Sequence, residues 1–514
     1  MARPVKTVDS AEQVYDPVEA FRRASNPGAA GRSTIAPREW IIIYAAAPAL
    51  IVSPFLLGGM VWWAQVAIAI MQAIPFLLVL LPIPGPIAWK ERMVRLLRFP
   101  PFWLGGTFVL YVIIQALNPS WEQVYIDSTS YYVGERKPEY FISWLPTSMN
   151  TNFYVMNPWR MVVFWAGAWA FVCALWAGLR SRRAWLAIAW IALGTGAVLS
   201  MASIVHHLSS NEYLFWITEY KRNINAFGPF VYRNQGAAYL YLSMGIGFAL
   251  FFHLLNRNGL RSGLPLVALM LAFVCGLGVA INASRGGWIG GACVVLAFIV
   301  FLPFAIRWRD GFSWGSLVGF AAVLICMGGI GFWYSSTMDF SEIDEKWTKI
   351  MEERDDEASI GARIVLTEIT WQMFKDKPLT GWGGGSFHYQ FPYYAAAYPE
   401  IYFVGRSWWS QYGKVLRKYR QAHNDIVQFL SDYGIIGCSF LFLCGLYWFV
   451  RPILSLSFSV EGLMALSVAF AFLVHNFADF FLQNSITLQS WLILLLLSAG
   501  LKVSNRPQRR SRSA

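Results

Sequence analysis

The chain has 514 residues, of which 56% are hydrophobic and only 14% are charged, against about a quarter charged in an ordinary soluble domain. Because a soluble surface needs more charge, this composition excludes a soluble multidomain enzyme, a disordered chain, a coiled coil and a small disulfide-stabilised secreted protein. The formal net charge is +12, but the basic residues lie in short segments between apolar runs, which is the pattern of membrane topology rather than of nucleic-acid binding.

The amino-terminal segment is polar and ends near Arg38, directly before the first apolar run. A cleaved signal peptide would carry its apolar stretch much earlier, so we predict an uncleaved cytoplasmic tail over residues 1–39. The six cysteines all lie inside apolar runs and have no CxxC spacing. We therefore expect buried thiols, with neither a disulfide nor a zinc site.

About twelve apolar stretches follow that are long enough to cross a bilayer, which takes roughly 20 residues at a rise of 1.5 Å each. They predict an all-α polytopic membrane protein. The predicted spans run near residues 40–57, 61–81, 102–117, 161–179, 185–205, 237–255, 265–281, 288–306, 317–333, 435–450, 463–479 and 486–501.

The placement of lysine and arginine predicts the orientation of these spans. If the amino terminus is cytoplasmic, the cytoplasmic segments hold 23 basic residues, against 7 in the short segments of the opposite side and 11 in the long segment 335–422. Long loops count little in the positive-inside rule, so both termini are expected in the cytoplasm. The chain then divides into an amino-terminal tail (1–39), spans 1–9 (40–334), an outer loop domain (335–422), spans 10–12 (423–501) and a basic tail (502–514).

The outer loop domain contains several predicted elements. Its acidic stretch, 341–357, is interpreted as a solvated helical face and not as a metal site. Residues 362–374 are predicted to form an amphipathic helix resting on the membrane or on the bundle, with Ile364, Val365, Ile369 and Phe374 near one face. A glycine-rich segment, 381–385, ends that helix, and an aromatic-rich stretch, 389–402, follows. Such aromatic side chains lie at the headgroup level or stack on sugar rings.

Three ionisable residues are predicted at the outer mouth of the bundle. Arg233 stands just before the sixth span, Arg285 lies in the tight turn between the seventh and eighth spans, and His423 precedes the tenth. Charged groups at membrane depth are costly, so they are candidates for function. Two structural alternatives stay open: either arginine could extend to lipid phosphates, and the segment around His423 could cap the next helix.

The other histidines have more ordinary interpretations. His206 and His207 are expected at the interface, and His253 at the cytoplasmic end of its span, away from the outer site. His475 and Asp479 could form a second polar pair near the outer end of the eleventh span, although structural partners are the simpler interpretation.

Several of these segments resemble motifs of the O-antigen ligase/polymerase superfamily. The resemblance runs, in the family's order and topology, from about Val231 to Gly437, and the amino-terminal half carries little signal of its own. The matching segments are Tyr232-Arg233-Asn234-Gln235, Ser284-Arg285-Gly286-Gly287, residues 361–371, 377–383 with Phe387, and residues 422–437 beginning Ala422-His423-Asn424-Asp425.

The resemblance implies a metal-independent glycosyltransferase with a GT-C-like fold and no cofactor, working on the periplasmic face of the bacterial inner membrane. Such proteins take a glycan from an undecaprenyl-diphosphate carrier and pass it to lipid A core, to a growing chain or to a protein hydroxyl. A ligase, a polymerase and a protein oligosaccharyltransferase therefore all remain open, as do the glycan and the oligomeric state.

The chemistry of glycosyl transfer from a lipid diphosphate needs side chains of the types found at these positions. The diphosphate leaving group gains charge as its bond to the sugar breaks, and Arg233 and Arg285 can hold phosphate oxygens in a bidentate manner. His423 is the candidate general base for the acceptor hydroxyl. Asn424 or Asp425 is expected to orient it, and Arg363, Asn234 and Ser284 complete the expected substrate-binding set.

Two other classes of protein compete with this interpretation. A flippase for lipid-linked oligosaccharides also has many spans and arginine-lined cavities, but it needs cationic groups accessible from both sides. A scaffold without catalysis would leave Arg285 and His423 without a role.

Overall fold

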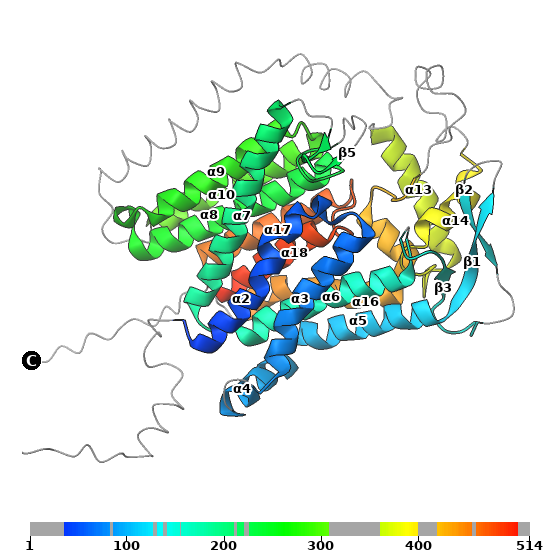
Figure 1. Ribbon diagram of the computed structural model, residues 1–514, viewed down its shortest axis with the longest axis horizontal. Helices are drawn as coiled ribbons and strands as arrows, with labels where there is room; N and C mark the ends of the chain where they lie inside the picture. Colours follow the sequence, from blue (N-terminus) through cyan, green and yellow to red (C-terminus); the bar gives the residue numbers. More distant parts are fainter. Residues whose placement is uncertain are drawn as a thin grey trace, which may run out of the picture.

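The computed structural model describes residues 35–82, 86–126, 131–136, 141–154, 156–209, 213–219, 226–307, 360–398, 419–454 and 459–501. Its framework is a bundle of long helices (Figure 1). These are α2 (Pro37–Ile51), α3 (Trp62–Leu80), α5 (Pro100–Leu117), α6 (Pro158–Gly178), α7 (Arg182–Leu208), α8 (Arg233–Asn258), α9 (Leu264–Ile281), α10 (Arg285–Arg307), α16 (Asp425–Leu454), α17 (Val460–His475) and α18 (Ser485–Gly500).

Shorter elements connect and cover these helices. The helices are η1 (Ser53–Phe55), η2 (Leu57–Gly59), α4 (Pro86–Leu97), η3 (Leu260–Ser262), α13 (Ile360–Asp376) and α14 (Phe387–Ala395). The strands are β1 (Pro119–Ile126), β2 (Tyr131–Arg136), β3 (Ser148–Asn150), β4 (Tyr213–Leu214) and β5 (Thr218–Glu219).

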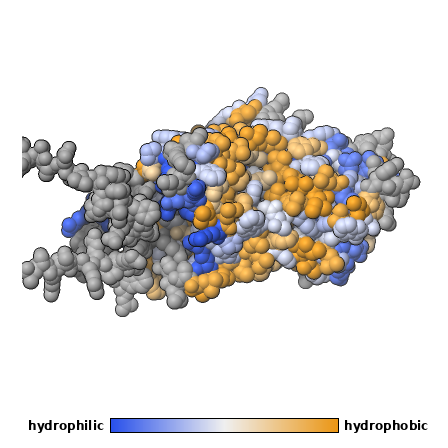
Figure 2. Space-filling model, turned by 90° about the horizontal axis from the view of Figure 1, so that it is seen from below, coloured by the Kyte–Doolittle hydropathy of each residue, from blue (hydrophilic) through white to orange (hydrophobic). Residues whose placement is uncertain are grey.

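The prediction of an all-α polytopic membrane protein is confirmed. Within the described ranges, nine helices are long and apolar enough to cross a bilayer, and α17 and α18 are shorter apolar helices. Together they account for eleven of the twelve predicted spans, while the predicted span 317–333 and the acidic stretch 341–357 lie outside the described residues. Figure 2 shows one face of the molecule, where apolar residues cover the middle and hydrophilic ones gather toward the two ends.

Helix α8 forms the centre of the bundle, because it packs against α7, α9, α10, α17 and α18. Small residues let the neighbouring backbones approach closely, as is common between membrane helices. A Cβ atom on Gly245 would lie 2.6 Å from the Val468 side chain, and one on Gly247 would lie 2.7 Å from that of Ala272.

The segment between α5 and α6 folds into a small three-stranded sheet with the order β2-β1-β3. Strands β1 and β2 are antiparallel, with Val124 opposite Val133, and β3 runs parallel to β1. Figure 1 places this sheet beside α13 and α14, at the same end of the molecule.

The predicted amphipathic helix over 362–374 exists as α13, and of the residues predicted on its apolar face Ile369 and Phe374 are buried and Val365 packs against the same cluster. Leu366, Ile369 and Met373 are buried and pack in a cluster with Trp382 and residues of α14. Ile364 is 60% exposed and lies outside this packed cluster. The spacing i, i+3, i+7 from Leu366 defines the face that meets α14 and α16, and Ile364 lies on another side of the helix.

Helix α16 contains a break at Gly434, near the end of the bundle where this helix begins. Gly434 has φ +63°, and a Cβ atom there would lie 2.3 Å from the carbonyl oxygen of Leu379. The break leaves backbone carbonyl groups of α16 without partners inside the helix, and other segments donate hydrogen bonds to them. Trp382 N donates to Ser431 O at 2.8 Å, and Tyr111 OH donates to Tyr433 O at 2.8 Å. The glycine-rich segment 381–385 is thereby attached to α16.

The eleventh predicted span ends earlier than expected. Helix α17 stops at His475, and residues 476–484 form a turn that leads into α18. The side chain of Asn476 causes this ending, because its Oδ1 accepts hydrogen bonds from the backbone N of Phe481 and Leu482, each at 3.1 Å. Asp479 therefore lies in the turn between α17 and α18 and not within a helix.

Candidate active site

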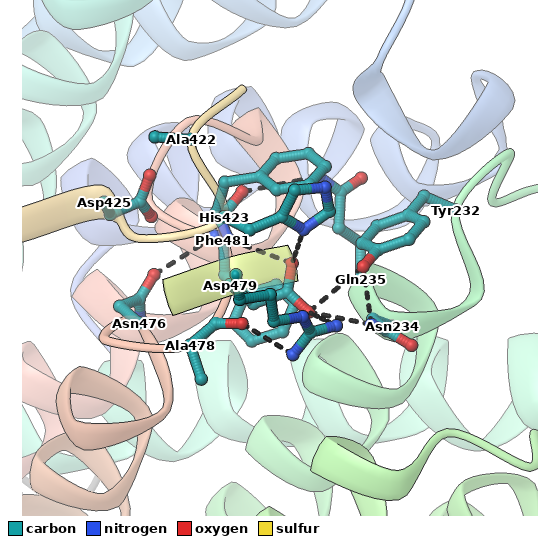
Figure 3. A network of polar contacts seen from close by, with 12 residues as sticks. Tyr232, Asn234, Gln235, Ala422, His423, Asp425, Asn476, Ala478, Asp479 and Phe481 are labelled. Atoms are coloured by element: carbon teal, nitrogen blue, oxygen red, sulfur yellow. Dashed lines mark hydrogen bonds and ion pairs between the residues drawn. The ribbon is translucent and has the colours of Figure 1, made fainter. Parts of the chain in front are cut away.

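The centre of the candidate site is the carboxylate of Asp479, which is fully buried. Its Oδ2 accepts hydrogen bonds from Asn234 Nδ2 at 2.7 Å and from Tyr232 OH at 3.2 Å. His423 Nδ1 lies 3.6 Å from Oδ1, and Arg363 Nη2 lies 3.7 Å from Oδ2. Figure 3 shows Tyr232, Asn234 and His423 converging on this one side chain. Four segments far apart in the sequence thus meet at one carboxylate.

The turn that carries Asp479 is held by the first residue of α16. The Asp425 carboxylate accepts hydrogen bonds from Leu482 N and from Gln483 Nε2, both at 2.7 Å. The backbone N of Asp425 in turn donates to Asn476 O at 2.9 Å. The start of α16 and the turn after α17 consequently behave as one unit, and His423 and Asp479 are placed by the same contacts.

His423 has an unusual backbone, with φ +53° in the left-handed region that non-glycine residues rarely adopt. The expected capping of the next helix is done by its neighbour, because Asn424 Oδ1 accepts a hydrogen bond from Val427 N at 3.2 Å. The imidazole lies edge-on to the ring of Phe480, at 4.9 Å between centroids. Its side chain keeps 26% exposure, so part of the ring remains accessible.

Arg363 comes from the first turn of α13. Its Nη1 donates to Ala478 O at 2.7 Å, directly before Asp479 in the chain. The Arg363 guanidinium therefore faces the Asp479 carboxylate, and much of its charge is balanced there.

The electrostatics of this cluster favour an ionised carboxylate. Burial by itself would raise the pKa of Asp479, but the facing His423 and Arg363 outweigh burial and lower that pKa to about 2. Burial, followed by the nearby Asp479 charge, raises the pKa of the Tyr232 phenol well above its ordinary value. Tyr232 consequently stays protonated and serves as a donor to Asp479.

The two remaining candidate arginines start helices beside this cluster. Arg233 is the first residue of α8 and stands between Tyr232 and Asn234, while Arg285 is the first residue of α10. Ser284 joins the two motifs, since its Oγ donates to Asn234 Oδ1 at 2.8 Å and accepts from Gly287 N at 3.1 Å. Both arginines are half-buried.

Glycines allow the first turn of α10 to approach its neighbours. A Cβ atom on Gly286 would lie 2.2 Å from His475 Nε2, and one on Gly287 would lie 2.4 Å from the Ala237 side chain. The pair of glycines next to Arg285 is thus required by packing, whatever the arginine binds.

All eight residues predicted for the site lie in or directly beside this cluster, but the partner of the histidine differs from the expected one. The carboxylate next to the imidazole is Asp479, and Asp425 instead holds the turn. His475 contacts Tyr241 OH at 3.2 Å and the ring of Phe481. A carboxylate inside an apolar run was the available signal for Asp479.

Two of the remaining histidines have local partners. His206 Nε2 lies 2.8 Å from Tyr213 O in the segment after α7. His253 and Glu461 form a buried pair at 3.3 Å near the last turn of α8 and the first turn of α17, at the opposite end of these helices from the site.

The fold and the site define a polytopic membrane protein that gathers a carboxylate, an imidazole and several guanidinium groups among the short segments at one end of its helices. A family model described as O-antigen ligase matches residues 270–442, which include Arg285, Arg363 and His423. No protein of known annotation matches the chain. The family match confirms the resemblance to the O-antigen ligase superfamily over these residues, and it supports a multi-pass membrane protein of the ligase or polymerase type of glycosyltransferase.

Proposed function

We propose that the protein transfers a glycan from an undecaprenyl-diphosphate carrier to an acceptor hydroxyl on the periplasmic face of the inner membrane. The observation that supports this most strongly is the pair His423–Asp479, which lies beside the two arginine motifs at one mouth of the bundle. A base, its orienting carboxylate and cations for a phosphate group are the components that such a transfer needs.

The leaving group is the first requirement. As the bond between the sugar C1 and the phosphate oxygen breaks, negative charge develops on the lipid diphosphate. Arg233 and Arg285 are proposed to stabilise this charge, because a planar guanidinium fork fits phosphate oxygens bidentately. Arg363 is proposed to contribute less, since it already faces Asp479 at 3.7 Å.

The acceptor is the second requirement. Its hydroxyl oxygen forms the new bond to C1 and must lose a proton. The Nδ1 atom of His423 faces Asp479, so Nε2 is the nitrogen proposed to accept that proton, and Asp479 stabilises the imidazolium that results. General-base assistance of this kind contributes roughly 10²–10⁴-fold to a rate.

The other predicted binding residues are proposed to shape the pocket. Asn234, Ser284 and Asp425 direct hydrogen bonds to neighbouring residues, which keeps the loops that border the substrate in place. Asn424 is proposed to border the acceptor side, next to the catalytic base.

The orientation proposed from the basic residues is consistent with the placement of the site. Arg180, Arg257 and Arg451 all lie near the ends of helices opposite to the ends that carry Arg233, Arg285 and Asp425. With both termini in the cytoplasm, the site then faces the periplasm.

The decisive experiment uses the purified full chain in lipid nanodiscs with an undecaprenyl-diphosphate-linked glycan and candidate acceptors: lipid A core, a lipid-linked chain or a protein. We expect a glycosylated product with the parent protein, unchanged by EDTA, and none with His423→Ala. His206→Gln changes a histidine whose Nε2 contacts Tyr213 O, and this variant should retain activity.

Two results would overturn the proposal. Movement of the intact lipid-linked glycan across the membrane without cleavage would identify a flippase. Equal product formation by His423→Ala and the parent would remove the base assignment.

A further inference from the structure

A second group of cations gathers at the end of the bundle away from the candidate active site. It is formed by Arg95 of α4 and Arg451 near the end of α16, with Arg180 after α6 beside them. The residues from Asp425 to Arg451 span about 40 Å at a rise of 1.5 Å per residue, so this group is separate from the active site. Figure 1 shows α4 set at an angle to the bundle.

The two arginines share one aromatic ring. The guanidinium carbon of Arg451 lies 4.9 Å from the centroid of Trp176, and that of Arg95 lies 5.9 Å from the same centroid. The ring of Trp176 also stacks on Phe99, at 4.6 Å. Two positive charges are therefore held close together on an aromatic surface at one end of the membrane helices.

The two acidic residues near this group form their closest contacts with Arg180 and with backbone N–H groups. Glu91 pairs with Arg180. Glu39 accepts hydrogen bonds from the backbone N of Arg180 and of Ser181, both at 2.6 Å, and from Ala36 N at 3.1 Å. Across the described part of the chain, neither Arg95 nor Arg451 pairs with a carboxylate, and the hydrogen bond of Arg95 goes to the carbonyl of Leu179 at 3.0 Å.

The excess positive charge is partly removed from water. Burial, followed by the like charge of Arg180, lowers the pKa of Arg95 to about 10. One turn earlier on α4, Arg92 is buried, and its Nε has no hydrogen-bond partner among the described residues. Glu39 and Glu91 offset part of this charge, but the arginines Arg92, Arg95, Arg180 and Arg451 outnumber them, and an excess of cations in such a place favours an anion as partner.

The surroundings of the group indicate what kind of anion this is. Val94 and Leu97 on α4 and Leu446, Ile453 and Leu454 on α16 are exposed apolar side chains. Trp and Tyr rings next to arginine are typical of the headgroup level of a bilayer. A ligand with a phosphate and long acyl chains would satisfy both the arginines and these side chains.

We propose that Arg95, Arg451 and Trp176 form a binding site for the phosphate of an anionic phospholipid. The lipid's acyl chains lie along the exposed apolar side chains of α4 and α16. Bound there, the lipid connects α4 to α6 and α16 and stabilises that end of the bundle. Each arginine near a membrane surface contributes about 1 kcal/mol to such binding, which corresponds to roughly fivefold in affinity.

The test measures lipid binding to the purified full chain in detergent micelles. Native mass spectrometry and the thermal unfolding midpoint are recorded with added dioleoylphosphatidylglycerol and, separately, with dioleoylphosphatidylcholine. We expect the anionic lipid to bind selectively and to raise the midpoint. Arg451→Gln should weaken that binding about fivefold, and the double variant Arg95→Gln/Arg451→Gln about 25-fold, with zwitterionic lipid unaffected.

Matched variants keep the proposal falsifiable. Arg261→Gln removes one exposed positive charge from the same end of the bundle, in η3, and should bind the anionic lipid like the parent. Arg451 makes no hydrogen bond within the described residues, so its glutamine variant keeps the fold even if the double variant does not.

Three outcomes would overturn the site. Arg451→Gln could bind the anionic lipid as tightly as the parent. Arg261→Gln could lose as much affinity as Arg451→Gln, which would indicate general surface charge. Inorganic phosphate could raise the midpoint as much as the lipid does, which would assign the arginines to a soluble anion.

Discussion

The imidazole Nδ1 of His423 lies 3.6 Å from Oδ1 of Asp479, although one residue precedes α16 and the other follows α17. The pair is closed by backbone contacts between the two segments, in which Asp425 N donates to Asn476 O and to Asp479 O. An imidazole with a facing carboxylate thus lies where two helices and a turn meet, and the proposed chemistry depends on this contact.

Asp479→Asn tests the orienting role of the carboxylate. The amide keeps the size of the side chain but cannot stabilise an imidazolium, so we expect glycan transfer to fall by about 10²–10⁴-fold while the protein still inserts and folds. The measurement is the transfer rate in nanodiscs at saturating donor. Asp376→Asn, which changes a carboxylate that accepts a hydrogen bond from Tyr394 OH, is the matched control. A rate within twofold of the parent would contradict the role.

The low pKa of Asp479 predicts a specific dependence of stability on pH. An aspartate has a pKa of about 3.9 in the unfolded chain, whereas Asp479 has a pKa of about 2 when folded. Its contribution of about 2–3 kcal/mol is therefore complete above pH 4 and is lost as the pH falls from about 4 to 2. Thermal unfolding between these pH values should show a shallower loss of stability in Asp479→Asn than in the parent. Identical slopes would mean that the carboxylate is not held as described.

Arg285→Lys tests whether the geometry of the guanidinium matters in addition to its charge. A lysine keeps the positive charge but offers no planar fork for two phosphate oxygens, so we expect a loss of at least tenfold in the transfer rate. The same exchange at Arg257, an exposed residue at the other end of α8, should have no effect. If Arg285→Lys worked as well as the parent, the arginine would act as a point charge or lie outside the site.

Gly286→Ala tests the close packing beneath Arg285. The added Cβ would lie 2.2 Å from His475 Nε2, so the first turn of α10 must shift, and we expect a destabilisation of about 1–3 kcal/mol together with reduced transfer. Gly194→Ala is the control, because no atom lies within 4 Å of its Cβ position in α7, and alanine there should leave stability unchanged or raise it. Equal unfolding midpoints for the two variants would contradict the packing argument.

Much of the architecture follows from local sequence. Runs of about 20 apolar residues must satisfy their own backbone hydrogen bonds in lipid, so they become helices wherever they occur. For the same reason the motif residues Arg233, Arg285 and His423 could be assigned to one end of the bundle before any contact was known. The local sequence pattern was less informative about which face of a helix is buried and about the residue at which a helix ends. The predicted apolar face of α13 is divided between the packed Ile369 and the exposed Ile364, and the eleventh span was extended through residues that Asn476 folds into a turn.

The amino-acid sequence by itself determined the membrane class, the positions of the spans and the short segments that carry ionisable groups, because these depend on hydropathy and charge along the chain. Only the tertiary structure decided which carboxylate faces His423. Asp425 is a near neighbour in sequence, yet its oxygens are taken by the turn before α18, while Asp479 reaches the imidazole from another helix pair. Which side chains from distant segments come into contact depends on how the helices pack. That packing depends on all the helices together and cannot be inferred from a local stretch of sequence.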